Sequence, residues 1–150
     1  MHKTIFVEGI SGSGKSTITQ ETIKFLEQRG IRARKIDFPT NYLRPQIREA
    51  RAREKRDLIL ETYLFASDAR HQYTTEITLE LERTIFVSDR SYFSACVYCQ
   101  IEGFNVQDIL ALNRANPTPD LLFILDCTPE LALERIIQRA PAVIVKYKVK

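Results

Sequence analysis

Residues 9–16 combine glycines, hydroxyl groups and a lysine at a spacing that suits a phosphate chain. Glycines let successive backbone N–H groups curl around a phosphate, and the helix-like segment that begins at Lys15 points its positive end there. Lys15 adds a full positive charge, and Ser16 is placed to ligate the Mg²⁺ that accompanies a nucleotide. The spacing therefore predicts a phosphate-binding loop (P-loop) for a nucleoside triphosphate, rather than a plain glycine-rich turn. The predicted phosphate-contacting residues are Gly9, Ile10, Ser11, Gly12, Ser13, Gly14, Lys15, Ser16 and Thr17.

A second group follows the apolar segment 84–88, where Asp89 and Arg90 stand side by side. A carboxylate at such a strand end can hold magnesium directly or through water, and an arginine can bind an acceptor phosphate through two N–H groups. A structural ion pair is the alternative, and the P-loop favours the functional interpretation. We predict Lys15, Asp89 and Arg90 as the catalytic group, with Ser16 and Asp89 serving the metal.

Aromatic residues further along the chain are candidates for an acceptor pocket. Phe38 and Pro39 follow the expected strand at residues 31–37, and Phe65 lies in a long helix-like stretch from which it could stack on a flat base. Packing in the core is the alternative for a lone helical phenylalanine. The polar residues within about two helical turns of Phe65, which either hydrogen-bond a base edge or face solvent, are Asp68, Arg70 and His71.

Arg135 and Arg139 are four residues apart on the last helix-like segment and therefore share one face. On that face they could reach the donor nucleotide. The alternative is a solvated face paired with Glu134.

Short apolar segments alternate with helix-like ones, which is the pattern of a parallel sheet covered by helices on both faces. Ligands of such sheets collect at the carboxyl ends of the strands, which places the P-loop, residues 37–40, Asp89 and Asp126 along one edge. We therefore expect an α/β fold of three layers, α/β/α, with a parallel sheet. Expected strands cover residues 4–8, 31–37, 84–88 and 121–126, the last two of buried type. Expected helices cover 15–29, two stretches within 44–83, 93–101, 106–114 and 129–139.

The bulk composition is that of an ordinary soluble domain, with 150 residues of which 44% are hydrophobic and 27% charged. We expect residues 1–150 to form one domain. No apolar run approaches the roughly 18 residues of a membrane helix, and the N-terminus leads straight into a strand without a secretory signal. These features predict a cytoplasmic protein without membrane association.

The net charge of +3 is mild, and much of the basic excess lies in residues 44–56. That segment is either a solvated helix face or a rim that attracts phosphate, and nothing further supports binding to nucleic acid. Three cysteines form no disulfide framework. Cys96 and Cys99 match a redox or half-zinc spacing, but without a second pair we expect buried thiols.

Taken together, the motifs resemble the thymidylate kinase family in order and spacing over residues 3–139. The matching segments are Phe6-Val7-Glu8-Gly9 with the P-loop, Phe38-Pro39, Leu64 to Arg70, Ser88 to Ser94, Pro119 to Leu122, Leu125-Asp126 and Pro129 to Arg135. The resemblance implies a P-loop kinase fold and transfer of the ATP γ-phosphoryl group to dTMP, giving dTDP, with Mg²⁺ as cofactor. It also implies a homodimer built through helices.

The resemblance further implies roles for individual residues. Lys15 and the loop amides would cradle the donor phosphates, and Arg90 would hold the acceptor phosphate. Phe65 would stack on thymine, and Arg135 would lie near the donor nucleotide. The residues expected at the acceptor are Phe38, Pro39, Phe65, Arg70, Arg90, Phe93, Ser94 and Tyr98.

Several positions depart from the family pattern. Ser11 stands where the family has an acidic residue, and Ala69 stands where it has a base-reading arginine, with Arg70 one step late. The tripeptide Asp89-Arg90-Ser91 is instead typical of deoxynucleoside kinases. After about residue 139 the family's lid and C-terminal elements are expected to be missing. Val145, Tyr147 and Val149 alternate with lysines, which suggests a strand with one solvent-exposed face. A deoxynucleoside kinase and a catalytically impaired nucleotide-binding paralogue therefore remain open alternatives.

Overall fold

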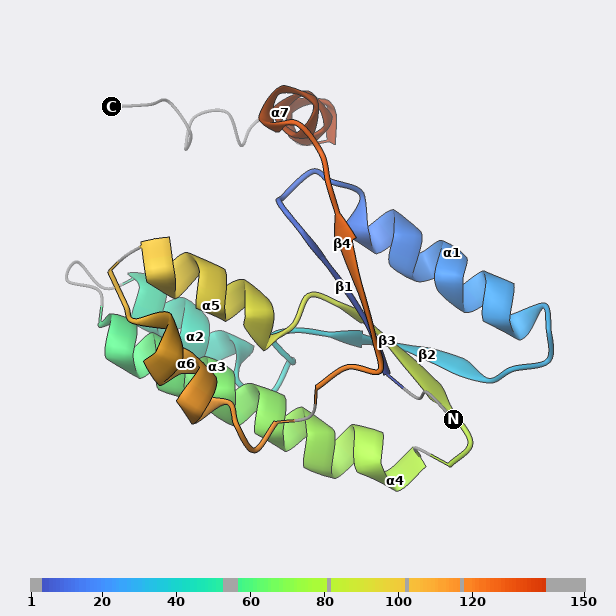
Figure 1. The fold of residues 1–150 in the computed structure, drawn as a ribbon, viewed down its shortest axis with the longest axis horizontal. Helices are drawn as coiled ribbons and strands as arrows, with labels where there is room; N and C mark the ends of the chain where they lie inside the picture. Colours follow the sequence, from blue (N-terminus) through green and yellow to red (C-terminus); the bar gives the residue numbers. More distant parts are fainter. Residues whose placement is uncertain (1–3, 53–56, 81, 102, 117, 140–150) are drawn as a thin grey trace.

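The computed structural model describes residues 4–52, 57–80, 82–101, 103–116 and 118–139. The expected strand in residues 140–150 and part of the basic segment, residues 53–56, lie outside the described residues. The described chain forms a parallel sheet in the order β2-β3-β1-β4 (Figure 1). Its strands are β1 Thr4–Gly9, β2 Ala33–Asp37, β3 Ile85–Asp89 and β4 Leu121–Leu125.

Helices connect each strand to the next, as the alternating sequence pattern predicted. Several of them begin with a side-chain cap; for example, Asp57 accepts from the Leu60 N–H and Asn105 accepts from the Gln107 N–H. The helices are α1 Lys15–Glu27, α2 Arg44–Ala52, α3 Leu58–Gln72, α4 Thr78–Glu80, α5 Tyr92–Ile101, α6 Val106–Leu112 and α7 Pro129–Arg139, with a π-helical turn at Tyr73–Ile77 between α3 and α4.

The sheet lies between two helical layers, because successive side chains of a strand point to opposite faces. Ile5 and Val7 of β1 pack with Val87 of β3 toward α1. Phe6 points the other way, into a core shared with α2, α3, α5 and α6 (Figure 1). This arrangement confirms the predicted three-layer α/β/α fold with a parallel sheet.

The strand register brings the chemistry-bearing segments to one edge. Val7 pairs with Asp89, Asp37 also pairs with Asp89, and Gly9 pairs with Leu125. The carboxyl ends of the strands therefore meet where the P-loop begins, as the rule for parallel sheets predicted.

A strand does form in the segment 121–126, but the prediction that this strand is buried is wrong. In β4, Leu121, Leu122 and Phe123 are each more than 40% exposed, and Ile124 is 72% exposed. The physical reason is position: β4 pairs with β1 on one side and is the edge strand of the described sheet. An apolar run indicates a strand, but burial depends on the neighbours that the fold supplies.

Smaller corrections concern element ends. The first helix ends at Glu27 rather than at residue 29, and a turn that includes Gly30, in left-handed conformation, delays the second strand to Ala33. The stretch 44–83 contains more than two helical pieces, because α3 continues through the π-helical turn into α4. Among the described residues, no helix is both long and apolar enough to cross a membrane.

Candidate active site

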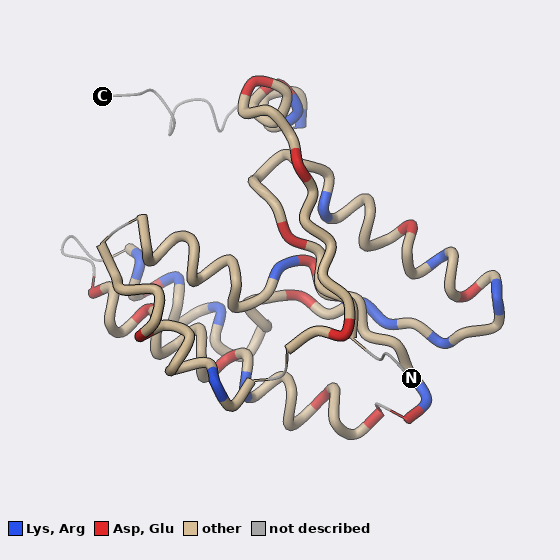
Figure 2. Tube along the Cα trace, in the orientation of Figure 1, with Lys and Arg blue, Asp and Glu red and all other residues tan. Residues whose placement is uncertain are grey.

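A cavity of about 270 Å³ opens at the carboxyl edge of the sheet. Its lining comes from the P-loop and the start of α1, from the end of β3, and from α7. Figure 2 shows basic residues at the start of α1, at the β3–α5 connection and on α7. The lining residues are Ser11, Gly12, Gly14, Lys15, Ser16, Thr17, Asp89, Arg90, Arg135 and Arg139. The structure thus brings the predicted catalytic group together with most of the P-loop.

The shape of the P-loop depends on two glycines that could carry no side chain. At Gly12, with φ of 86°, an added Cβ would lie 2.3 Å from the carbonyl oxygen of Ala132 in α7. At Gly9, with φ of 146°, it would lie 2.7 Å from the carbonyl oxygen of Leu125. Both positions combine a backbone conformation that favours glycine with a close approach to another element. The contact at Gly12 leaves no room for any side chain, because α7 lies directly against the loop.

Lys15 is folded into the loop, with only 5% of its surface exposed. Its Nζ donates to the carbonyl oxygens of Gly9 at 2.9 Å and Ile10 at 2.5 Å. Burial lowers the pKa of Lys15 below its ordinary value, and the positive charge of Arg90 lowers it further. The ammonium group is therefore held at the cavity by loop carbonyls rather than by a carboxylate partner.

Ser16 and Asp89 meet across the cavity floor. The hydroxyl of Ser16 donates to Asp89 Oδ2 at 2.5 Å, which joins the first turn of α1 to the last residue of β3. A hydroxyl and a carboxylate are hard oxygen ligands of the kind that Mg²⁺ uses beside nucleotide phosphates and water. Among the described residues no cluster of three or more carboxylate, histidine or cysteine side chains could hold a metal alone. The donor set fits a magnesium ion that arrives with a nucleotide.

Arg90 adopts a left-handed backbone conformation, with φ of 79°, and is the one non-glycine residue among those described with positive φ. Its N–H donates to the Val7 carbonyl at 3.1 Å, and its own carbonyl accepts from the Ser88 hydroxyl at 2.5 Å. Its guanidinium donates to the hydroxyl oxygens of Ser11 at 3.1 Å and Ser94 at 3.5 Å. Both the backbone and the side chain of Arg90 are thus fixed toward the cavity.

One charged residue beside the cavity escaped the sequence-based site prediction. Glu8, 8% exposed, lies directly before the P-loop and accepts from the hydroxyls of Ser91 at 2.6 Å and Ser94 at 2.7 Å. Glu8 lies in the segment Phe6-Val7-Glu8-Gly9 that matches the family pattern, but a single acidic residue at a strand end does not by itself indicate a role. The two serines that reveal its role are more than 80 positions away in the sequence.

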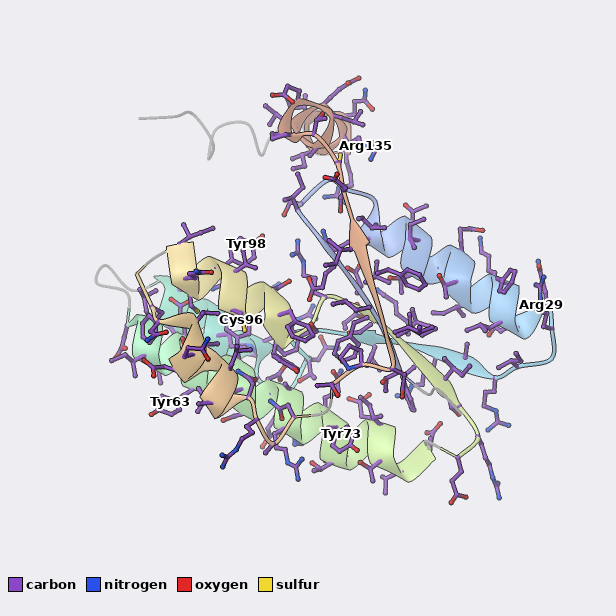
Figure 3. All side chains as sticks on the ribbon, in the orientation of Figure 1. Arg29, Tyr63, Tyr73, Cys96, Tyr98 and Arg135 are labelled. Atoms are coloured by element: carbon purple, nitrogen blue, oxygen red, sulfur yellow. The ribbon has the colours of Figure 1, made fainter. Side chains whose placement is uncertain are left out.

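The aromatic candidates cluster away from the phosphate cavity. Phe38 and Phe65 are both buried in one core, with ring centroids 5.6 Å apart, and the guanidinium of Arg51 lies 5.0 Å from the centre of the Phe65 ring. Phe93 packs against the same core. Tyr98 is 43% exposed and lies on the opposite side of α5 from the buried Cys96 (Figure 3). The core-packing alternative for Phe65 therefore describes its place in the structure.

The side chain of Arg70 points away from the phosphate cavity. Its guanidinium donates to the carbonyl of Ala115 at 2.7 Å and lies 5.8 Å from the Tyr73 ring centre, and Arg70 is absent from the cavity lining. The neighbouring His71 stacks on Tyr42 at 4.2 Å. The one-residue offset noted in the sequence has directed Arg70 toward the connection between α6 and β4.

Arg135 and Arg139 approach the cavity from α7. Arg135 donates to the Gly12 carbonyl at 3.4 Å, and Figure 3 shows it on the side of α7 that faces β4. Arg139, which the sequence placed on the same face, also lines the cavity and contributes to the lowered pKa of Lys15. α7 makes little buried contact with the rest of the described structure, because Ala132 is its one buried residue among those described.

A P-loop cradle, a hydroxyl–carboxylate pair and converging cations on a parallel α/β sheet define a nucleotide-binding protein of the P-loop class. Comparison with known proteins places the chain within that class. A family model described as thymidylate kinase matches residues 7–149. The chain belongs to the thymidylate kinase family.

Individual relatives agree with the family model. A probable thymidylate kinase of Staphylothermus marinus is 30% identical over 132 residues, which is 87% of this chain and 66% of the relative. A thymidylate kinase of Xanthomonas campestris is 34% identical over 140 residues, 92% of this chain and 62% of the relative. A probable thymidylate kinase of Archaeoglobus fulgidus is 33% identical over 138 residues, 90% of this chain and 69% of the relative. The chain thus spans somewhat under two thirds of the first two relatives.

Proposed function

We propose that this chain transfers the γ-phosphoryl group of ATP to the 5′-phosphate of dTMP, giving dTDP. The observation that carries the proposal is the convergence of Lys15, the Ser16–Asp89 pair and Arg90 on one cavity of about 270 Å³. The acceptor is inferred from the family, since its relatives are named thymidylate kinases.

On the donor side, the P-loop amides and Lys15 bind the β- and γ-phosphates of ATP. The positive end of α1 and the buried ammonium group neutralise charge there. Arg135 and Arg139 add cations from α7. Each of these groups positions the phosphate chain, which is most of what phosphoryl transfer asks of a protein.

Ser16 and Asp89 would hold the magnesium ion. The ion supplies neutralisation of the phosphate charge and a template for the phosphate oxygens. Asp89 carries the one carboxylate that lines the described cavity, so its charge offsets part of the surrounding positive field.

On the acceptor side, Arg90 binds the 5′-phosphate of dTMP through N–H groups that the serine hydroxyls leave available. From the family resemblance we further propose that Phe38, Pro39, Phe65, Phe93, Ser94 and Tyr98 contribute to the sugar and base pocket. Phe38 and Phe65 would do so from the buried core, and Tyr98 would do so from the exposed side of α5. Arg70 takes no part in this proposal because its guanidinium is bonded to the Ala115 carbonyl.

A protein nucleophile is unnecessary, because the acceptor phosphate attacks directly. The thiols fit this view, since Cys96 and Cys99 are buried and burial raises the pKa of Cys96.

As further proposals, residues 1–150 form one kinase domain that acts in the cytoplasm as a homodimer. Exposed apolar side chains on α3, α5 and α6 are available to a second copy: Ile59, Tyr63, Val97, Ile101 and Leu110. Sedimentation equilibrium tests the dimer, and a monomer at micromolar concentration would contradict it.

The test of the activity offers Mg·ATP with dTMP or thymidine in parallel to the purified chain. We expect ADP release with dTMP and none above background with thymidine. Release with thymidine alone would assign the chain to nucleoside phosphorylation, as Ser91 hinted. ATP binding without turnover on either acceptor would identify a nucleotide-binding paralogue that does not catalyse transfer.

A further inference from the structure

Glu8 is a buried carboxylate that the proposed mechanism leaves without a task. It is the penultimate residue of β1, directly before Gly9 of the P-loop, and 8% of its surface is exposed. A carboxylate is costly to bury unless its oxygens are hydrogen-bonded, so its partners identify what it does. Each of its two oxygens accepts one short bond, from Ser91 to Oε1 at 2.6 Å and from Ser94 to Oε2 at 2.7 Å.

The two serines perform different tasks with their remaining lone pairs. Ser91 Oγ accepts from the backbone N–H of Phe93 at 3.2 Å, which caps the start of α5. Ser94 Oγ accepts from Nη1 of Arg90 at 3.5 Å. Because Ser94 gives its proton to a carboxylate, its oxygen is left as an acceptor with enhanced negative character toward the arginine. Ser94 thus links Glu8 to Arg90, because its hydroxyl donates to the Glu8 carboxylate and accepts from the Arg90 guanidinium.

The guanidinium of Arg90 is held from both sides. Ser94 accepts from one terminal nitrogen, and Ser11 of the P-loop accepts from the other at 3.1 Å. Two acceptors on a planar group fix its orientation, while its remaining N–H groups stay available for a phosphate. The backbone hydrogen bond from the Arg90 N–H to Val7 fixes the base of the side chain.

We propose that Glu8 is a positioning residue for the acceptor phosphate: through Ser94 it holds the Arg90 guanidinium in the orientation that the cavity requires. The inference rests on the proposed function for the identity of the acceptor, dTMP. Glu8 itself touches no reacting group. It acts by fixing a serine proton and by strengthening a serine oxygen as an acceptor.

The experiment compares the full chain with Glu8→Gln, Ser94→Ala and the double variant. Glutamine keeps the shape of Glu8 but loses its charge and can accept from only one of the two hydroxyls. We expect either single change to weaken dTMP binding about tenfold and to leave ATP binding within about twofold. The double variant should be no weaker than Ser94→Ala alone, because both changes break the same link. In turnover, the KM for dTMP should rise while kcat changes less than about threefold.

Asp120→Asn is the matched control. Asp120 accepts from the N–H and hydroxyl of Thr4 at the opposite end of β1, so Asp120→Asn likewise removes the charge from a carboxylate–hydroxyl bond of that strand. We expect it to lower thermal stability and to leave dTMP binding unchanged. Equal losses of dTMP and ATP binding in Glu8→Gln would overturn the proposal, and so would a loss of dTMP binding of the same size in Asp120→Asn.

A second readout needs no acceptor. The ¹⁵N relaxation of the Arg90 Nε–Hε group, assigned by its disappearance in Arg90→Lys, reports the mobility of the guanidinium in the nucleotide-free chain. We expect a rigid group in the wild-type chain and a mobile one in Glu8→Gln. If the wild-type chain binds ATP but no dTMP, the proposed acceptor is wrong, and this relaxation measurement alone decides the role of Glu8. An equally rigid Arg90 in both chains would refute that role.

Discussion

The two arginine-bearing sides of the cavity are built in different ways. Arg90 stands between β3 and α5, with its backbone bonded to Val7 and its guanidinium bonded to two serines. Arg135 stands on α7, a helix with one buried residue among those described, and reaches the Gly12 carbonyl at 3.4 Å. The acceptor side is therefore preorganised, whereas the donor side depends on how closely α7 approaches the loop.

Lys15→Ala removes the buried cation of the P-loop, and we expect the largest effect from it. Turnover should fall at least about 100-fold, because a buried cation aimed at the phosphates is lost. The fold should survive, as judged by circular dichroism. Lys24→Ala on the same helix, an exposed residue paired with Glu21, is the control and should leave turnover unchanged. Full activity of Lys15→Ala would remove the P-loop from the mechanism.

Gly12→Ala should disrupt the donor side specifically. Its Cβ would collide with the Ala132 carbonyl at 2.3 Å, so α7 must move away from the loop. We expect ATP binding to weaken about tenfold, the scale of one lost set of phosphate contacts. Gly30→Ala carries a similar backbone strain, with φ of 72° and nothing within 4 Å of the added Cβ. It should cost about 1 kcal/mol of unfolding free energy and leave ATP binding unchanged. Equal ATP affinity in the two variants would mean that α7 does not serve the donor.

The lowered pKa of Lys15 sets an upper pH limit for ATP binding on the donor side. Burial and Arg90 lower this pKa below 10.5, so phosphate binding, which needs the ammonium form, is complete below the lowered pKa and falls as pH rises through it. Between the lowered pKa and 10.5 the unfolded chain binds more protons, so the Lys15 contribution to folding stability rises with pH there. We expect ATP affinity, measured by calorimetry, to fall as the pH is raised from 8 toward 10.5.

Lys15→Arg is the control for this pH dependence, because a guanidinium stays charged throughout the range. Its affinity for ATP should be lower at pH 8 but should not decline further by pH 10. A decline in the variant that matches the wild-type chain would assign the titration to another group.

Arg135→Ala should have a smaller effect than these changes. The residue is exposed and makes one long bond to the loop, so we expect ATP binding to weaken about threefold with dTMP binding unchanged. Calorimetric titration with each nucleotide separates the two. A larger loss for dTMP than for ATP would contradict the assignment of α7 to the donor.

Arg70→Ala should have the smallest effect on the acceptor side. Its guanidinium is bonded to the Ala115 carbonyl, so we expect the KM for dTMP to change less than about twofold. A tenfold increase would show that Arg70 turns into the pocket when dTMP binds, as the family resemblance originally suggested.

The parts of the fold that could be predicted are those with local signals. The P-loop, the central strands and α7 carry their pattern within a few residues, so their positions agree closely with the sequence-based prediction. The exposure of β4 could not be read in this way, because the same apolar run suits a central or an edge strand. The π-helical turn at Tyr73–Ile77 likewise has no sequence signature that separates it from α-helix.

The candidate site likewise contains residues that could be predicted from local signals and residues that could not. Ser16 and Asp89 could be paired from the sequence because each belongs to a recognisable motif at a strand end. Glu8 could not, because its meaning comes from Ser91 and Ser94, which tertiary structure brings to it. The direction of Arg70 was foreseeable only as a rotation of about 100° on an ideal helix, whereas its actual partner, Ala115, follows α6.

The most direct test of the central claim is to identify the product of the reaction. The purified chain is incubated with Mg·ATP and dTMP, and ³¹P NMR follows the phosphates, with Lys15→Ala measured in parallel. We expect dTDP and ADP in equal amounts from the wild-type chain, and neither from the variant. Failure to form dTDP, or equal formation by Lys15→Ala, would contradict the claim that this cavity transfers a phosphoryl group to dTMP.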